Sequence, residues 1–215
     1  MADILPFNPL DKTSLGASVA EAMMKSATHA LAAVPEFSGA GIYAIYYSGK
    51  FPAYSELVKH NSGGKFLAPI YVGKAIPSGA RKGGGLGAGV SGKSLYSRLR
   101  EHATSISAVS NLDLRDFQCR FLVVDDIWIP LTESLIITRC SPIWNTLIDG
   151  FGNHDPGSGR HKGMRPRWDV LHPGRGWADK CTARKETAAD IEADVKTFLR
   201  AFSFPSSETV VDLDV

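Results

Sequence analysis

The chain has 215 residues, 44% hydrophobic and 21% charged, which is typical of a globular protein that can bury a core. The formal net charge of +2 permits a nucleic-acid partner without requiring one, because binding depends on where the charge lies. No apolar run approaches the roughly 18 residues of a transmembrane helix and a secretory signal is lacking, so we expect a cytoplasmic protein with no membrane partner.

The first half of the chain predicts one helix, two strands and a loop. Residues Ser14–Val34 place apolar side chains at helical spacing, and Pro35 ends that helix. Gly41–Tyr47 is rich in β-branched and aromatic residues and predicts a strand, as does Pro69–Val72 after a long connection. Ser78–Gly92 contains seven glycines and predicts a flexible loop.

The second half predicts two helices around a strand, and then a final helix. Ser94 is a plausible N-cap for a helix that runs to about Ala108. Phe117–Val124 predicts a strand, and Pro130–Arg139 predicts a helix. A further apolar face at helical spacing predicts a helix over Arg184–Phe202.

The number and spacing of the cysteines argue against disulfide bonds and against a structural zinc site. The three cysteines, Cys119, Cys140 and Cys181, are odd in number, widely spaced and without a CxxC pair. We expect all three to be reduced, buried packing residues.

Several of the predicted helices and strands carry side chains that could take part in catalysis. Arg98 and His102 are four positions apart, so they share one face of a helix. Alternate residues of a strand share a face, so tyrosines on two paired strands can converge at one edge of a small sheet. A glutamate near a helix start can present its carboxylate to a hard divalent ion. In chain order the set is Gly41-Ile42-Tyr43, Tyr71-Val72-Gly73, Arg98, His102, Glu133 and Asn145.

This ordered set resembles the GIY-YIG nuclease family over roughly Gly39–Asn145. The resemblance implies an α/β (α+β) fold in which helices flank a small central antiparallel sheet. It also implies a catalytic core at residues 39–148. An N-terminal helical extension at 1–38 would precede the core, and a basic DNA-contacting loop with a C-terminal helix at 149–215 would follow it.

The resemblance also implies roles in phosphodiester hydrolysis. Glu133 would hold one Mg²⁺ or Mn²⁺ ion at the scissile phosphate, and the planar fork of Arg98 would stabilise charge on the phosphoryl oxygens. Tyr43 would position or deprotonate the attacking water. Because a tyrosine pKa near 10 makes a poor base, His102 could accept the proton instead, and the choice stays open. Lys74, directly after the second motif, is a candidate for lowering the pKa of a tyrosine.

Two departures from the usual family pattern indicate a branch. The link from Gly41 to Tyr71 is long and implies an insertion, and His102 stands where many members carry another tyrosine. Some type II restriction enzymes of the family resemble the chain in both respects, which implies a bacterial enzyme and a GC-rich palindrome such as CCGCGG. One active site cuts one strand, so we expect a homodimer on double-stranded DNA, with the N-terminal or C-terminal helix as the interface.

Two basic segments are candidate DNA surfaces for such a nuclease. In and after the glycine-rich loop, Arg81, Lys82 and Lys93 could contact phosphates. In the stretch Arg160–Arg175, arginines could read guanines in the major groove. The candidate DNA-contacting residues of that stretch are Arg160, Lys162, Arg165 and Arg167.

Three alternatives remain open. The chain could be a GIY-YIG homing or repair nuclease, or a module that keeps the fold and binds DNA without cutting it. Gly87–Ser94 also matches the phosphate-loop pattern G-x-x-x-x-G-K-S of an NTPase. Such a loop must leave directly from a buried strand, and the glycine-rich residues before it are a poor strand. ATP binding abolished by Lys93→Ala would revive this alternative.

Overall fold

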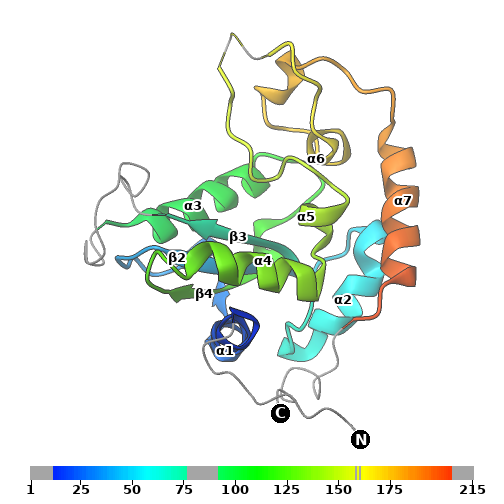
Figure 1. Ribbon diagram of the computed structural model, residues 1–215. Coiled ribbons are helices and arrows are strands. Elements are labelled where there is room, and N and C mark those ends of the chain that lie inside the picture. Colours follow the sequence, from blue (N-terminus) through cyan, green and yellow to red (C-terminus); the bar gives the residue numbers. More distant parts are fainter. Residues whose placement is uncertain (1–11, 77–91, 158, 160, 205–215) are drawn as a thin grey trace, which may run out of the picture.

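The computed structural model describes residues 12–76, 92–157, 159 and 161–204. Within these ranges the strands form one sheet of order β1-β4-β2-β3, and every neighbouring pair is antiparallel. Helices lie on both sides of this sheet (Figure 1), which confirms the predicted fold class. The strands are β1 (His29–Ala30), β2 (Gly41–Tyr47), β3 (Pro69–Ala75) and β4 (Phe117–Val123).

Helices cover the two faces of the sheet unequally. The helices α1 and α4 pack on one face, and α3 lies on the other together with the remaining helices. The helices of the described residues are α1 (Lys12–Lys25), α2 (Ser55–Asn61), α3 (Ser94–Ser107), α4 (Ile129–Cys140), α5 (Ile143–Thr146), α6 (Arg167–Leu171) and α7 (Ala188–Ala201).

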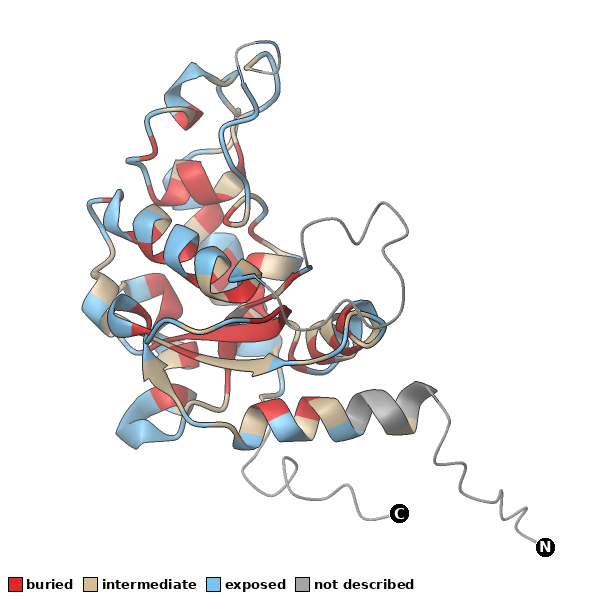
Figure 2. Cartoon of the chain, turned by 90° about the vertical axis from the view of Figure 1, so that its left-hand side faces the viewer, coloured by how far each residue is buried: buried red, intermediate tan, exposed pale blue. Residues whose placement is uncertain are grey.

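Strand β2 is buried along its whole length, between two separate apolar cores. Tyr43 and Ile45 face the core that contains α3, whereas Ile42 and Ala44 face the core under α1 and α4. A strand covered on both faces needs apolar residues at every position, and the sequence GIYAIYY supplies them. In Figure 2 the buried centre of the molecule is red, while the outer faces of the helices are pale blue.

The N-terminal helix is shorter than predicted. We expected it to run over Ser14–Val34, but α1 ends at Lys25 and the chain then forms β1 and a short 3-10 turn. Met23 belongs to the core on the α1 side, whereas Leu31 belongs to the core on the α3 side. One straight helix cannot reach both cores, so the chain must leave the helix and cross the end of the sheet.

The connection between β2 and β3 contains helix α2, which was not predicted from the sequence. Asn61 at its end ties the two strands together. Its Nδ2 donates to the Tyr47 carbonyl (3.0 Å) and the Ala68 carbonyl (2.8 Å), and its Oδ1 accepts from the Ala68 amide at 2.9 Å. The insertion therefore returns the chain in register for β3, which runs to Ala75 and past the predicted end at Val72.

Helix starts differ from prediction for local reasons. Ser94, predicted as an N-cap, is the first residue of α3. The last long helix was predicted from Arg184, but α7 begins at Ala188. There Thr187 and Asp190 form a reciprocal capping box, which fixes the start.

The cysteines are free, as predicted. Cys119 and Cys140 are buried, and burial raises the pKa of their thiols to about 12 and about 11. Cys181 is only half-buried, so the prediction that all three are buried holds for two of them. No helix among the described residues has the length and hydropathy to cross a membrane.

Candidate active site

Tyr43 of β2 and His102 of α3 meet at the centre of the site. The Tyr43 hydroxyl lies 2.6 Å from His102 Nε2, and both residues are 1% exposed. Tyr71 of β3 joins them, with its ring centroid 6.2 Å from that of Tyr43 and 5.2 Å from that of His102. The structure therefore brings together the two phenols and the imidazole that the motifs placed on separate elements.

Burial holds Tyr43 and His102 in their neutral forms. Loss of solvent raises the pKa of Tyr43 well above 10, and Tyr71 adds to this while the Arg98 guanidinium opposes it. Loss of solvent also lowers the pKa of His102 well below 6.5, helped by nearby positive charge, that of Arg98 foremost. At neutral pH both groups are neutral, and the contact lets the phenol donate to Nε2 in the tautomer that carries its proton on Nδ1.

Arg98 lies next to the two tyrosines, one helical turn before His102. Its Nη2 donates to the Gly152 carbonyl at 2.6 Å, and its Nη1 donates to Glu101 at 2.8 Å and also contacts His154. The guanidinium side chain remains 20% exposed. It is therefore a fixed cation with one side open to solvent, which suits the binding of a phosphate.

Glu133 of α4 and Lys74 of β3 complete the site. Lys74 Nζ lies 2.6 Å from Glu133 Oε2, and the side chains are 33% and 17% exposed. The Tyr71 pKa is raised mainly by burial, and the Glu133 charge contributes, so the carboxylate acts on the same site as the phenols. The contact that the structure gives Lys74 is with Glu133, whereas the cation that lowers the pKa of both tyrosines is Arg98.

The donor set fits a metal ion that arrives with its substrate. Within the described residues no group of three or more His, Cys, Asp or Glu side chains could hold an ion alone. Mg²⁺ commonly keeps several waters and takes one or two carboxylates together with phosphate oxygens. Glu133 is one carboxylate that acts on Tyr71 together with the Arg98 guanidinium, and Lys74 pairs with it.

Two glycines provide the space for these close approaches. A Cβ atom on Gly73 would lie 2.4 Å from the Tyr43 hydroxyl. A Cβ atom on Gly152 would lie 2.6 Å from the Tyr71 hydroxyl and 3.2 Å from Arg98 Nη2. The glycine of the second motif is therefore needed because the Tyr43 ring occupies the place of a side chain.

The Asn145 side chain hydrogen-bonds the backbone of the edge strand β3. Its Oδ1 accepts from the Val72 amide and its Nδ2 donates to the Val72 carbonyl, both at 2.8 Å. Because β3 is an edge strand of the sheet that the described residues form, these outward-facing groups have no strand partner within it. Asn145 thus fixes the backbone between Tyr71 and Gly73.

The segment after α5 forms part of the site, although its sequence did not predict this. Phe151 stacks on His102, with ring centroids 4.6 Å apart and planes 19° apart, and Gly152 and His154 contact Arg98. The only signal in the sequence was a stretch rich in glycine and histidine, which we had assigned to a DNA surface. Nothing in its spacing indicated that it folds back onto α3.

The candidate DNA-contacting residues divide into three groups. Arg81, Lys82 and Arg160 lie outside the described residues, as does most of Gly87–Ser94. Lys93 pairs with Glu36 at an exposed position, and Lys162 is exposed. Both lysines remain available for phosphate contacts.

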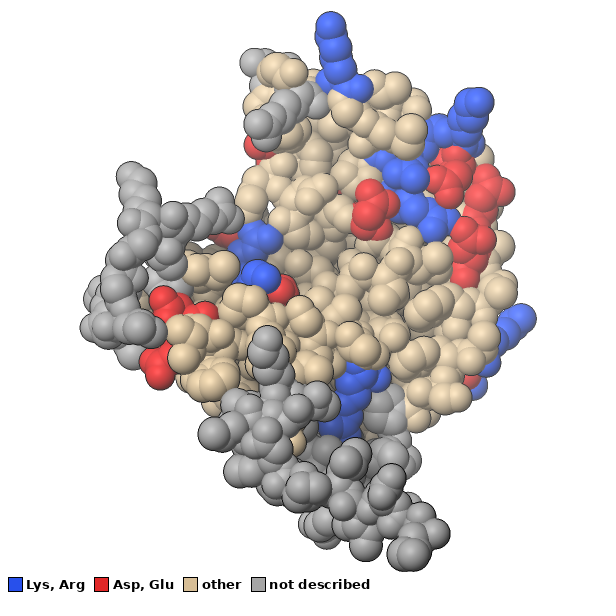
Figure 3. Space-filling view, viewed as in Figure 1, with Lys and Arg blue, Asp and Glu red and all other residues tan. Residues whose placement is uncertain are grey.

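Two arginines of the basic stretch are engaged within the protein. Arg165 lies 3.3 Å from Asp179 and donates to the Ala178 carbonyl at 3.0 Å. Arg167 is 11% exposed and contacts Glu186 at 3.0 Å. Figure 3 shows cations and acidic side chains intermixed around α6 and the start of α7. These contacts favour structural roles for both arginines over base reading.

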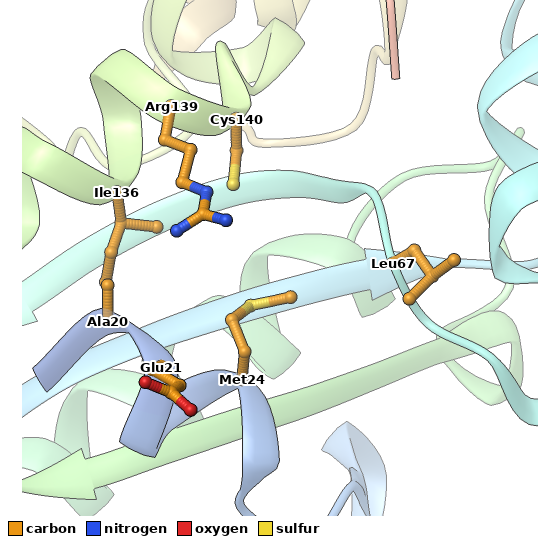
Figure 4. A pocket seen from close by; sticks show the side chains of 7 residues that line it. All are labelled: Ala20, Glu21, Met24, Leu67, Ile136, Arg139 and Cys140. Carbon is orange, nitrogen blue, oxygen red and sulfur yellow. The ribbon is translucent and has the colours of Figure 1, made fainter. Parts of the chain in front are cut away.

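A pocket away from these residues lies between α1 and α4 (Figure 4). Most of its lining is apolar, and none of the site residues takes part. The lining residues are Ala20, Glu21, Met24, Leu67, Ile136, Arg139 and Cys140. It is therefore a gap in the helix packing that is separate from the cluster around Tyr43.

Paired tyrosine strands, an Arg and His from the following helix and a glutamate from α4 define a nuclease of the GIY-YIG class. The family match is more specific. Residues 35–199 match the model of the Eco29kI GIY-YIG domain, and the chain belongs to this family of type II restriction endonucleases. A search of curated proteins finds no match. The predicted family is thus confirmed, and the chain carries a nuclease domain.

Proposed function

We propose that the protein is a type II restriction endonuclease that cuts a palindromic double-stranded DNA site with one divalent ion, Mg²⁺ or Mn²⁺. The observation that carries this proposal is the contact between Tyr43 and His102 beside the Arg98 guanidinium. Family membership supports the reaction class.

Arg98 would bind the scissile phosphate. Hydrolysis builds negative charge on the phosphoryl oxygens, and a guanidinium already fixed by Gly152 and Glu101 needs little reorganisation to meet it. Glu133 would hold the divalent ion, which when bound neutralises charge at the phosphate and at the leaving oxygen. Lys74 would then give up its place on that carboxylate.

Tyr43 and His102 would activate the attacking water as a pair. A free phenolate is disfavoured, because burial raises the Tyr43 pKa. If Tyr43 passes its own proton to His102 Nε2 while it takes one from water, the phenol stays neutral before and after the step. The imidazolium that forms is then stabilised by the phosphate charge. In this scheme Tyr43 contacts the water, and His102 is the final acceptor.

The experiment is digestion of plasmid DNA in the presence of Mg²⁺, followed by sequencing of the ends. We expect discrete fragments that share one terminal motif, and a GC-rich palindrome such as CCGCGG is the first sequence to test. Glu133→Gln is expected to cut at least about 100-fold more slowly, because the site loses its metal-binding charge. The matched control is Glu56→Gln, since Glu56 also pairs with a lysine, 2.8 Å from Lys59, away from the site.

Two outcomes would contradict the proposal. If Glu133→Gln cuts as fast as Glu56→Gln, the assignment of the metal to Glu133 is wrong. If the protein retains DNA but does not cut it with any divalent ion, it is a binding module.

A homodimer would let two identical sites cut the two strands of a palindrome. We propose α1 or α7 as the interface. Light scattering on the DNA complex should give the mass of two chains per duplex, and the mass of one chain would contradict the dimer.

A further inference from the structure

The residues Gly150–Asn153, here called the floor turn, form the base of the catalytic cluster. The Asn153 amide donates to the Gly150 carbonyl at 3.0 Å and closes the turn. On the side that faces the site, the Gly152 carbonyl accepts from Arg98, and Phe151 stacks on His102. Displacement of this turn would therefore move both the phosphate-binding group and the proton acceptor.

The Arg175 guanidinium donates hydrogen bonds to three backbone carbonyls of the floor turn. Its Nη1 donates to the Phe151 carbonyl (3.0 Å) and the Asn153 carbonyl (3.1 Å), and its Nη2 donates to the Gly150 carbonyl at 2.9 Å. The remaining two N–H groups donate to the two oxygens of Asp169 at 2.7 and 2.6 Å. All five donors of the side chain are used.

Arg175 and Asp169 are buried, and two tryptophan rings lie against the guanidinium. The side chains of Arg175 and Asp169 are 4% and 1% exposed. The guanidinium carbon lies 4.4 Å from the ring centroid of Trp168 and 4.8 Å from that of Trp177. Such a buried pair is weak as a source of stability, because desolvation offsets its attraction, but its fixed geometry can specify the position of what it holds.

We propose that Arg175 is a positioning residue for the nuclease reaction. It holds the floor turn so that Gly152 presents its carbonyl to Arg98 and Phe151 covers His102. The inference rests on the proposed function, in which Arg98 binds the phosphate and His102 accepts the proton. It also corrects our expectation that arginines up to Arg175 could read guanine, since this guanidinium has no donor left for a base.

The test is a double-mutant cycle on cleavage of a duplex that carries the recognition site. The single variants are Arg175→Met and Arg98→Lys, the latter chosen because a measurable residual rate should remain. The readouts are the single-turnover rate at saturating DNA and Mg²⁺, the DNA affinity without metal, and the thermal midpoint. Arg120→Met is the matched control, because Arg120 also donates to a backbone carbonyl and lies 5.5 Å over a tyrosine ring, on the opposite face of the sheet.

We expect Arg175→Met to slow cleavage on the order of 100-fold well below its thermal midpoint, because a misplaced catalytic group costs about that much. DNA affinity should change little. In the Arg98→Lys protein, adding Arg175→Met should lower the cleavage rate little further. The reason is that both substitutions disrupt the same interaction, that of Arg98 with the phosphate. Arg120→Met should lower the thermal midpoint and leave the rate unchanged.

Other outcomes overturn the inference in distinguishable ways. If Arg98→Lys cuts at the wild-type rate, the proposed role of Arg98 is wrong and the inference falls with it. If Arg98→Lys is slow but Arg175→Met, like Arg120→Met, cuts at the wild-type rate, only the positioning role is wrong. The same holds if the rate reductions of the two single variants multiply in the double variant. Should Arg175→Met fail to fold, Arg175→Lys takes its place in the cycle. It keeps the charge beside Asp169 with three donors in place of five, and we expect it to be slow as well.

Discussion

At the scale of single residues, the chemistry of the site depends on the buried position of the Tyr43 hydroxyl. The Tyr43 hydroxyl lies against His102 and Tyr71 inside the core, so its proton stays within the site and has little contact with solvent. Tyr46, on the opposite face of the same strand, is equally buried, but its hydroxyl donates to the Met24 sulfur at 3.3 Å rather than to an imidazole. The position of the Tyr43 ring is in turn set by Gly73, on which it packs.

We predict that Gly73→Ala slows cleavage on the order of 100-fold, since the new Cβ, 2.4 Å from the Tyr43 hydroxyl, must push that group off His102. Single-turnover cleavage at saturating DNA measures the effect. Gly63→Ala is the control, because Gly63 has a φ of +64° and nothing within 4 Å of a new Cβ. It should lose about 1 kcal/mol of stability from backbone strain and keep the wild-type rate. A Gly73→Ala protein that cuts normally would show that the Tyr43 position is not critical.

At the scale of secondary structure, β3 is an edge strand that carries Tyr71, Gly73 and Lys74. Two asparagine side chains bond its backbone, Asn145 on the outer side of β3 and Asn61 between the start of β3 and the end of β2. Asn61 bonds the backbone where β3 begins, at Ala68, and Asn145 bonds it at Val72, within the catalytic motif. Both use an amide to satisfy a buried N–H and a C=O together, so they form a matched pair.

We predict that Asn145→Ala and Asn61→Ala each cost about 1–3 kcal/mol of unfolding free energy, because both leave buried backbone groups without partners. Only Asn145→Ala should also slow cleavage in the folded protein, since Val72 lies between Tyr71 and Gly73. Urea unfolding gives the stability, and single-turnover kinetics give the rate. Equal rates for the two variants would mean that Asn145 is a structural clamp alone.

Secondary structure was predictable where one local pattern sufficed. Strands β2 and β4 follow directly from their apolar composition, and Arg98 and His102 share a face because helical periodicity requires it. The end of α1 was not predictable, since it depends on Met23 and Leu31 entering different cores. The floor turn was missed for a similar reason, because Arg175, which grips it, lies 22 to 25 residues further along the chain.

At the scale of the whole molecule, a chain of buried hydrogen bonds joins the C-terminal segment to the core. Trp144 Nε1 donates to the Tyr54 hydroxyl at 2.8 Å, and that hydroxyl lies 2.7 Å from His172 Nε2. The other ring nitrogen, Nδ1, lies 2.9 Å from the Asn111 side-chain oxygen. These partners assign a neutral imidazole with its proton on Nδ1. These hydrogen bonds connect four separate parts of the chain through the His172 ring.

We predict that this ring makes the fold sensitive to acid. Burial lowers the pKa of His172 to about 3, whereas histidine in an unfolded chain titrates near 6.5. Between these values the unfolded state binds more protons, so stability is complete above about pH 6.5 and falls as the pH drops towards 3. By pH 4.5 the loss from His172 should be about 3 kcal/mol, at about 1.4 kcal/mol per pH unit.

The buried neutral His102 acts in the same direction, so wild type must be compared with His172→Gln. Glutamine can still accept from Tyr54 but cannot take up the proton. Urea unfolding at pH 7.5 and 4.5, at one protein concentration, measures both proteins. His172→Gln should be the less stable protein at pH 7.5, because its shape fits the pocket less well, and it should lose about 3 kcal/mol less than wild type on acidification. If both proteins lose the same free energy, the imidazole already accepts a proton in the folded state, and the hydrogen-bond chain through Tyr54 does not hold it neutral.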